Sequence, residues 1–454
     1  MATAVATPRV EQPPEVCAAE LPRGPRVAAF AQTFAFALAP TWVMDQCARR
    51  YGDTFTLTFG PSGRKLVVVS DPDAVKRVFT APPEVAPSAA DSSPIAPVMG
   101  PSSVITLTGP EHMRQRKLLL PPFHGERMRE YEDVIVAATR HSMAEWPLGR
   151  PMKLAERTRA ITLEVILRAV FGVEAERMGA LREAIGGLLG PVQLPAMLLF
   201  ALRRPSAERP GGSIGRALAH LDTVIYAEIA RRRAQEDLAE RADILSLLLL
   251  ARDEDGQAMT DSELRDELVT LLLAGHETTA TAVAWAVERL VRHPAKLERL
   301  VAEIDAGEGD EYMQAVISET LRVRPVVPQV VRVLREPLRV GAHELPVGTR
   351  VVPSIYLTNR SPRVYDAPAE FRPERFLENP PETFSWIPFG GGIRRCIGAS
   401  FATLEMKLIL ATTLSELAPS VPSRGRRRGR GEGIRRRAIT LVPSAGARVV
   451  WRRR

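Results

Sequence analysis

The chain has 454 residues, of which 45% are hydrophobic and 25% are charged, as in a soluble globular protein with a large buried core. Three cysteines are too few for a disulfide framework or a zinc site of four thiolates, and their scarcity favours a reducing compartment. The formal net charge of +8 is compatible with an acidic protein, a membrane surface or nucleic acid as partner, and it selects none of them.

The N-terminal part of the chain lacks a convincing membrane span. Residues 1–25 are rich in Pro, Ala and Glu without an apolar period, so we predict a mobile arm followed by a single domain over residues 26–454. The most apolar early stretch, Val27 to Met44, is interrupted by Pro40 and holds three polar residues. A spanning helix needs about 20 mostly apolar residues without such breaks. We therefore expect no membrane span and a cytoplasmic protein.

The sequence predicts a mainly α fold with small β-sheets. Residues 54–60 (TFTLTFG) and 65–72 (KLVVVSDP) have the β-branched content and bounding turn residues of two strands. Helical patterning dominates from about residue 109 to 300, and the Pro- and Gly-rich residues 206–215 are expected to form a mobile loop within it. Short strands return between Arg332 and Pro353.

The most informative helix is expected to begin after Thr260 and to end before Pro294. Thr260 and Glu263 have the spacing of a capping box, which satisfies free amides at a helix start. A helix of ~32 residues would be ~48 Å long and could cross a domain of this size. Its middle, LVTLLLAGHETTATAVAW, is apolar on nearly every face, so we expect it to run through the core.

Polar residues nevertheless lie at the centre of this helix, where Glu277, Thr278 and Thr279 follow one another. A buried carboxylate costs free energy unless it is paired or has a function. A threonine can also bond the carbonyl one turn back, here that of Ala274, and loosen the helix locally. Taken alone, these residues fit either a satisfied core network beside a packing glycine or a functional site.

Three further motifs follow along the chain. Residues 319–322 (ETLR) place a carboxylate and a guanidinium on one helix face, and residues 371–376 read FRPERF. Residues 389–398 (FGGGIRRCIG) place a cysteine in a glycine-rich loop, directly behind two arginines. In this order, the central helix and the three motifs resemble those of the cytochrome P-450 family of haem-thiolate monooxygenases. The resemblance runs from about Arg23 to Arg448.

The resemblance implies that the protein binds heme b with Cys396 as the axial thiolate ligand. A cysteine thiolate pushes electron density toward bound oxygen and favours O–O cleavage. The helical residues after Gly398 put the thiolate near a helix N-terminus, whose partial positive charge favours an anion. By the same resemblance, Phe389 shields the sulfur and Arg394 binds a haem propionate. The alternative is a buried thiol with only a structural role.

Other site residues are carried over from the family in the same way. Propionates need cationic donors, and the resemblance implies that His112, Arg116 and Arg332 supply them together with Arg394. It also implies a buried ion network that supports the haem face, formed by Glu319, Arg322 and Arg375.

On the opposite side of the haem, the residues AGHETT match the family's oxygen-activating segment. The resemblance implies that Ala274 faces the haem and that Gly275 leaves room for O2. It further implies that Thr278 relays protons, with Glu277 as its acidic partner. Positioned proton delivery is typically worth ~10²–10⁴ in rate.

Electrons are expected to come from NAD(P)H through a separate ferredoxin and its reductase, because no flavin or nicotinamide site is recognisable after Trp451. Such carriers are usually acidic, and Arg114, Lys117 and Arg395 lie near the motifs that frame the expected docking face. Residues 423–437 hold eight arginines without interleaved aromatic residues. A solvated loop is therefore favoured over a nucleic-acid patch.

The substrate is expected to be an apolar small molecule. Three candidate pocket segments, residues 95–105, 188–200 and 326–331, contain no charged residue. They favour a terpenoid, steroid, fatty acid or macrocycle, and we place Val327, Val330 and Ala274 in the pocket. A haem-thiolate isomerase or dehydratase and a non-catalytic haem carrier or sensor remain as alternative classes. We expect a monomer.

Overall fold

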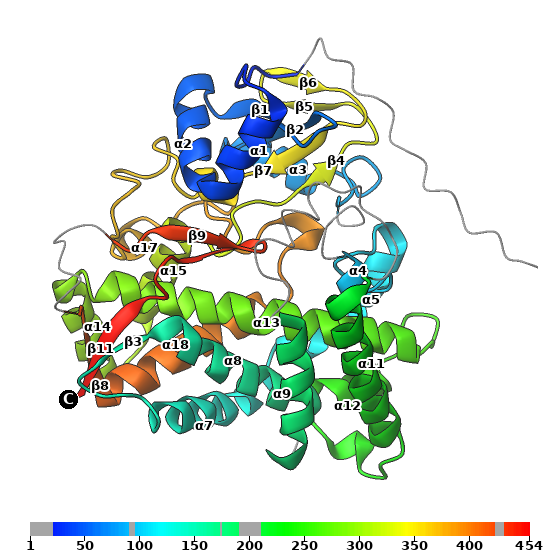
Figure 1. Ribbon diagram of the computed structural model, residues 1–454, viewed down its shortest axis with the longest axis vertical. Coiled ribbons are helices and arrows are strands. Elements are labelled where there is room, and N and C mark those ends of the chain that lie inside the picture. The colour runs from blue at the N-terminus through cyan, green and yellow to red at the C-terminus, as the bar shows by residue number, and fades with distance from the viewer. Residues whose placement is uncertain (1–20, 90–95, 173–174, 190–209, 423–430) are drawn as a thin grey trace, which may run out of the picture.

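The computed structural model (Figure 1) describes residues 21–89, 96–172, 175–189, 210–422 and 431–454. Most of the predicted arm, residues 1–20, lies outside the described residues. From Leu21 the chain runs beside strand β1 (Thr54–Phe59). The amide and the hydroxyl of Thr56 donate to the carbonyls of Arg23 and Pro22, 3.2 and 2.6 Å away. These two bonds fix the end of the predicted arm to the sheet.

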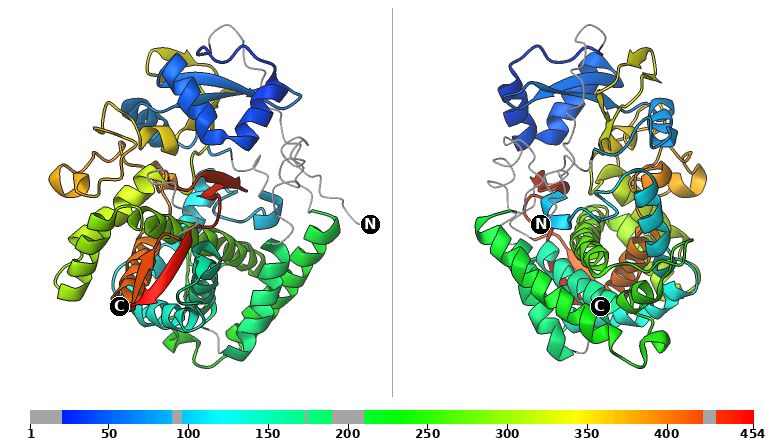
Figure 2. Two further views of the ribbon diagram at one scale, coloured as in Figure 1. Left: turned by 60° about the vertical axis from the view of Figure 1, so that its left-hand side comes forward. Right: turned by 90° about the vertical axis from the view of Figure 1, so that its right-hand side faces the viewer.

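The fold is mainly α with small β-sheets, as predicted. Figures 1 and 2 show the first helices and the sheet that contains β1 at one end of the molecule and most of the helices at the other. The helices of the described residues are α1 (Ala29–Leu38), α2 (Pro40–Tyr51), α3 (Pro72–Thr80), α4 (Ala96–Met99), α5 (Gly109–Leu119), α6 (Arg127–Glu130), α7 (Glu132–Met143), α8 (Leu154–Phe171), α9 (Ala175–Leu189), α11 (Gly212–Arg233), α12 (Ile244–Leu250), α13 (Asp261–Leu290), α14 (Pro294–Ala306), α15 (Glu311–Val323), α16 (Ile355–Thr358), α17 (Arg375–Glu378) and α18 (Ala399–Glu416).

The largest sheet joins distant parts of the chain. The two predicted strands are confirmed as β1 and β2 (Arg64–Val69), which pair antiparallel, and β2 pairs in parallel with β7 (Arg350–Pro353). The strand order is β1-β2-β7-β4, with β4 at Arg332–Val333. The other described strands are β3 (Pro151–Lys153), β8 (Leu417–Ser420) and β11 (Arg448–Arg453) in one sheet, and the hairpins β5 (Leu338–Val340) with β6 (His343–Leu345) and β9 (Ile434–Arg437) with β10 (Thr440–Pro443).

The central helix is α13, and its predicted capping box is confirmed. The Thr260 hydroxyl accepts from the Glu263 amide at 3.2 Å, and the Glu263 carboxylate accepts from the Thr260 amide at 2.7 Å. Pro294 is the first residue of α14, in keeping with its expected role as a helix stop. Every residue from Thr279 to Leu290 is buried, so this half of the helix runs through the core.

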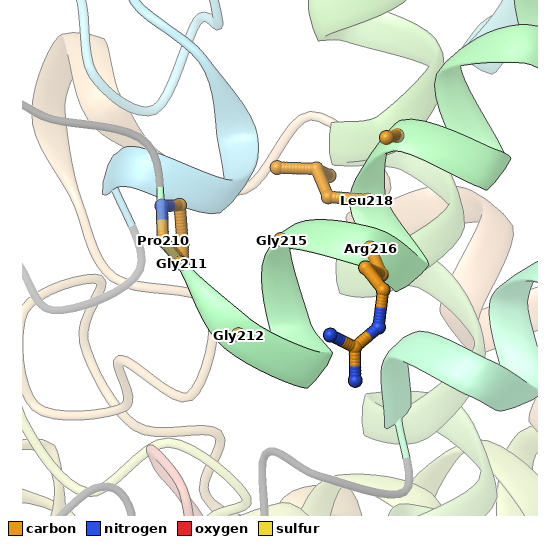
Figure 3. A pocket seen from close by; sticks show the side chains of 7 residues that line it. Pro210, Gly211, Gly212, Gly215, Arg216 and Leu218 are labelled. Carbon is orange, nitrogen blue, oxygen red and sulfur yellow. The ribbon is translucent and has the colours of Figure 1, made fainter.

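The predicted loop at residues 206–215 includes the first residues of a helix. Residues 206–209 lie outside the described residues, and α11 already begins at Gly212. Gly212 has a φ of +67°, which side chains with a Cβ rarely adopt, so glycine suits this position. The recess at this helix start (Figure 3) is lined by three glycines, Pro210, Arg216, Leu218 and Ala219. It brings no pair of titratable groups together.

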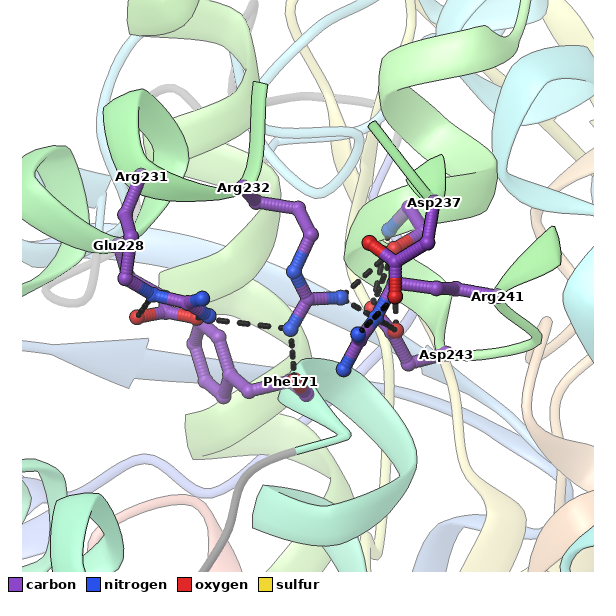
Figure 4. Close-up of polar contacts among 8 residues, drawn as sticks. Phe171, Glu228, Arg231, Arg232, Asp237, Arg241 and Asp243 are labelled. Atoms are coloured by element: carbon purple, nitrogen blue, oxygen red, sulfur yellow. Dashed lines mark hydrogen bonds and ion pairs between the residues drawn. The ribbon is translucent and has the colours of Figure 1, made fainter. Parts of the chain in front are cut away.

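A buried ion network fixes α11 to its neighbours (Figure 4). Arg232, fully buried on α11, binds the Asp243 carboxylate, the Ser246 hydroxyl and the carbonyl of Phe171, which ends α8. Asp243 in turn caps α12 by accepting from the Ser246 amide at 3.0 Å. One guanidinium therefore joins the ends of three helices.

Replacing Arg232 by alanine should lower the free energy of unfolding by about 3–5 kcal/mol, because it leaves the buried Asp243 with only the longer ion pair to Arg241 at 3.4 Å. Arg231→Ala is the matched control, since it removes a more exposed ion pair with Glu228 and should cost about 1 kcal/mol or less. Urea unfolding at matched haem content measures both values. Equal losses in the two variants would contradict the role given to Arg232.

Candidate functional site

The cysteine loop is shaped by glycines and by hydrogen bonds to its own backbone. The Cys396 amide donates to the Phe389 carbonyl at 2.9 Å, and the Phe389 ring packs edge-on against Trp386. Gly390 and Gly392 have φ values of +70° and +66°, which side chains with a Cβ rarely adopt. A Cβ on Gly392 would also lie 2.0 Å from the carbonyl oxygen of Phe79, so this glycine lets α3 approach the loop.

Positive groups near Cys396 offset the effect of burial on the pKa of its thiol. Burial raises the pKa of Cys396, whereas a hydrogen bond from the Gly398 amide and the charges of Arg395 and Arg116 lower it. Gly398 is the N-cap of α18, so the amide that reaches the sulfur belongs to a helix start. The sulfur thus lies where a thiolate can be stabilised.

Two uncovered residues lie inside the molecule. Cys396 is deep enough for burial to dominate its pKa, yet its side chain is exposed. Ala274 is exposed as well, although it lies near the middle of the long helix α13. Interior residues that other side chains leave uncovered are available to a ligand, and a cysteine thiolate is one of the ligands that haem iron takes in proteins. The residues fit a haem.

A cationic cluster accompanies the cysteine. His112, Arg332 and Arg394 line one small cavity, which Thr108 also borders. His112 is buried, its Nδ1 has no hydrogen-bond partner, and its pKa is lowered to about 4. The cause is burial together with the charges of Arg394, Arg116 and Arg332. Four cationic or potentially cationic groups therefore converge here.

These arginines hold no carboxylate among the described residues. Arg394 donates to the carbonyls of Val104, Ile105 and Leu107, and Arg332 donates to the Val331 carbonyl and lies over the Phe79 ring. Burial lowers the pKa of each guanidinium to about 10. Buried cations without acidic partners fit an anionic ligand, and a haem carries two propionates.

The central helix is tied to α8 near its polar segment. Thr278 donates its hydroxyl to the Ala274 carbonyl at 2.7 Å, as predicted for a threonine in a helix. The α8 residue Thr162 donates to the His276 carbonyl at 2.8 Å. A Cβ on Gly275 would lie 3.1 Å from Cδ1 of Ile166, so packing against α8 accounts for this glycine. The expectation that Gly275 makes room for O2 is not needed to explain it.

The Glu277 carboxylate and the Thr278 hydroxyl are not hydrogen-bonded to each other. Both carboxylate oxygens of Glu277 lack hydrogen-bond partners, and the group lies 3.7 Å from Arg159 on α8 and 3.2 Å from Arg437 on β9. Burial raises the pKa of Glu277, and Arg159 opposes this shift. Sequence reasoning missed both arginines, because each lies more than a hundred residues away from Glu277 along the chain.

The Glu-x-x-Arg pair lies in the core. Arg322 donates to both carboxylate oxygens of Glu319, at 2.6 and 2.8 Å, and both residues are fully buried. Arg375 reaches the same carboxylate at 3.2 Å, and the Arg372 amide does so at 2.7 Å. Further Arg322 hydrogen bonds go to the carbonyls of Asn359, Pro368 and Glu370. The structure therefore brings the three residues of the expected network together.

Two residues expected on a basic docking face already have acidic partners. Arg114 binds Asp253 and Glu263 at 2.5 and 2.6 Å, and Lys117 binds Glu254 at 2.6 Å. Their charges are therefore compensated within the chain. Arg395 is exposed and has no ion pair among the described residues.

The pocket segments are only partly described. Val327 and Val330 are half-buried and pack against the cluster of Val67, Val69 and Val351. Residues 190–200 of the second segment lie outside the described residues, and α4 falls within the first segment.

A fold with a long central helix, a cysteine at a helix start and a buried cationic cluster defines a haem-thiolate protein. A family model for cytochrome P450 matches residues 22–433. The chain is 43% identical over 437 residues to putative cytochrome P450 137 of Mycobacterium tuberculosis, covering 95% of this chain and 90% of that protein. Putative cytochrome P450 138 of Mycobacterium bovis is 37% identical, with 99% and 98% covered. The chain belongs to the cytochrome P450 family, whose members bind haem through a cysteine thiolate and use O2.

Solved structures show the same fold. Retinoic acid-bound cyanobacterial CYP120A1 superposes with a TM-score of 0.81 at 24% identity, covering 96% of this chain and all of that one. The cytochrome P450DA haem domain superposes with a TM-score of 0.83 at 22% identity, covering 96% and 97%. No helix in the described part of this chain is long and apolar enough to cross a membrane.

Sequence reasoning also missed Glu405, a fully buried carboxyl on α18. Burial raises its pKa to about 8, against a hydrogen bond from Thr279 on α13 that lowers it. A lone glutamate in the apolar run FATLEMKLIL was the available signal. The group is neutral at pH 7 and joins the helix after the cysteine to the central helix.

The Glu405 carboxyl should make the protein less stable as pH rises. Its pKa is about 8 in the folded chain against 4.5 as the ordinary value, so the unfolded chain binds fewer protons between these limits and stability falls. Glu405→Gln should remove this fall. At pH 8 its free energy of unfolding should exceed that of wild type by roughly a few kcal/mol. Urea unfolding at several pH values measures it. Glu416→Gln, at the exposed end of α18, should leave the slope unchanged. Parallel slopes for wild type and Glu405→Gln would contradict the assignment.

Proposed function

We propose that this protein is a monooxygenase that inserts one oxygen atom from O2 into an apolar small molecule, with heme b held by Cys396. The observation that carries the proposal is the Cys396 thiol, which lies deep in the fold, uncovered, and beside the Gly398 amide and two arginines. When bound, the haem supplies the activation of O2. The chain supplies binding, orientation and protons.

The residues around the haem have separate tasks in this proposal. Cys396 is the axial ligand, and Phe389 limits access to the sulfur through its packing on Trp386. His112, Arg116, Arg332 and Arg394 bind the propionates. The Arg394 guanidinium is already oriented by three backbone carbonyls, so little freedom is lost when it binds an anion.

Proton delivery is assigned to Thr278 and Glu277. The Thr278 hydroxyl is held by the Ala274 carbonyl beside the exposed Ala274 side chain, so it lies at the face that receives O2. A buried carboxyl with a raised pKa is a better proton donor near neutral pH, which favours Glu277. Transfer to Thr278 requires this carboxylate to leave Arg159 and Arg437 and turn along the helix.

The substrate and the electron donor follow from the surroundings of the site. The residues assigned to the pocket are apolar and carry no charge that could bind a polar group. They are Val327, Val330 and Ala274, and they favour terpenoids, steroids, fatty acids or macrocycles over polar compounds. Electrons from NAD(P)H arrive through an acidic ferredoxin and its reductase. Arg395, next to Cys396 and free of an ion pair among the described residues, is the residue assigned to that contact.

The haem-thiolate assignment is tested by the reduced carbon monoxide complex. Wild-type protein should show the red-shifted Soret band that thiolate ligation produces. Cys396→Ser should lose that band, whereas Cys47→Ser, which changes a buried cysteine elsewhere, should keep it. A histidine-type band in well-folded wild-type protein would refute ligation by Cys396.

Thr278→Ala should bind haem and substrate normally but divert electrons from NADPH into hydrogen peroxide, because the hydroxyl that guides protons is gone. The ratio of product to NADPH consumed should fall about tenfold or more. Thr278→Ser keeps the hydroxyl and should retain most of the coupling. Unchanged coupling in the alanine variant would rule out the proposed relay.

A further inference from the structure

An apolar surface on the first helix has no role in the oxygen chemistry. It consists of Val27, Phe30, Phe34, Leu38 and Trp42, which are between 58% and 74% exposed. We call this surface the α1 face. Figure 2 shows α1 and α2 in dark blue at the end that holds the largest sheet, away from most of the helices. Single exposed apolar residues are ordinary, but a contiguous set of large ones indicates an interaction surface.

The spacing of these residues puts them on one side of the helix. Phe30, Phe34 and Leu38 follow one another at four-residue intervals, so their side chains form a stripe along α1. Val27 precedes the helix and Trp42 lies in the first turn of α2. Exposed apolar residues therefore continue along the chain past both ends of α1.

The opposite side of α1 is fixed to the sheet, so the α1 face cannot turn inward without breaking packing. Gln32 and Phe36 are buried, and the Phe36 ring packs edge-on against Phe59 at 5.1 Å. Gln32 accepts from the Thr58 amide at 3.0 Å and donates to two carbonyls of the preceding segment. The helix is apolar on both sides, and the sheet covers only one of them.

The charges around the α1 face are positive. The sequence from Val27 to Met44 contains no charged residue, and the exposed Arg23 and Arg26 directly precede it. On the covered side of α1, the Arg436 guanidinium of β9 lies over the Phe36 ring at 5.6 Å, so this side also carries a positive charge. The first acidic residue after the stretch, Asp45, accepts a hydrogen bond from Tyr356 and so faces the protein.

We propose that the α1 face docks this protein on the surface of an anionic lipid bilayer. The aromatic and aliphatic side chains would enter the headgroup boundary, and the surrounding arginines would contact lipid phosphates. The helix would lie on the bilayer and not cross it, since α1 has ten residues and spanning needs about 20.

A second copy of the chain fits this surface less well. In a two-fold dimer the same patch meets itself, so Arg23 and Arg26 of each copy would approach those of the other. Like charges around a small apolar contact oppose association. An anionic bilayer offers the opposite charge at every position of the rim.

Flotation of full-length, haem-loaded protein with vesicles tests the proposal. Vesicles of phosphatidylcholine mixed with phosphatidylglycerol should carry the protein, and pure phosphatidylcholine should carry much less. Phe30→Ser with Phe34→Ser should weaken binding to the anionic vesicles roughly tenfold or more. Arg23→Glu with Arg26→Glu should weaken it by about tenfold. Leu148→Ser with Leu377→Ser, which changes exposed leucines elsewhere, should bind like wild type.

Trp42 offers an independent readout, because brominated lipids quench only tryptophans that reach the acyl chains. Anionic brominated vesicles should quench part of the wild-type fluorescence, and Trp42→Phe should lose that component. Wild-type protein that does not float with anionic vesicles would overturn the proposal. So would vesicle binding that is unchanged in the double serine variant. Self-association that the same variant abolishes, in the absence of vesicle binding, would assign the face to a second copy and overturn it too.

Discussion

A charge that is buried needs a partner, and the site of this protein is arranged around that requirement. Burial alone would keep Cys396 protonated, so the Gly398 amide and two arginines must supply positive potential at the sulfur. The cluster around His112 needs negative charge instead, because its cations lack carboxylate partners among the described residues. A ligand with a metal centre for the thiolate and two carboxylates for the arginines satisfies both sets of groups together.

The same requirement links the site to the core. Glu319 holds Arg322, and Arg322 donates to the carbonyl of Asn359. The Asn359 side chain accepts from the Ile387 amide at 2.9 Å, and the Ile387 carbonyl accepts from the Gly390 amide at 2.9 Å. The buried pair is thus connected by hydrogen bonds to the loop that carries the cysteine.

Local patterns predicted much of the fold, and long-range partners could not be predicted. The capping box at Thr260 and the first two strands depend on neighbouring residues, which the sequence displays directly. The arginines that pair with Glu277 come from α8 and β9, and tertiary packing alone brings them there. Arg114 illustrates the same limit. Its position near the haem-binding motifs in the sequence suggested an unpaired cation on a docking face, but the fold pairs it with two carboxylates. The cysteine motif was informative because its function requires contiguous residues.

The threonine bonds between α8 and α13 have a mechanical consequence. Thr158 and Thr162 donate to the carbonyls of Ala280 and His276, so two successive turns of the central helix are latched to one neighbour. Sliding or rotation of either helix past the other would break both bonds at once and leave buried polar atoms unpaired. The two helices therefore form one rigid unit. A motion that admits a bulky molecule must therefore occur in the elements that pack against these two helices, and not between α8 and α13.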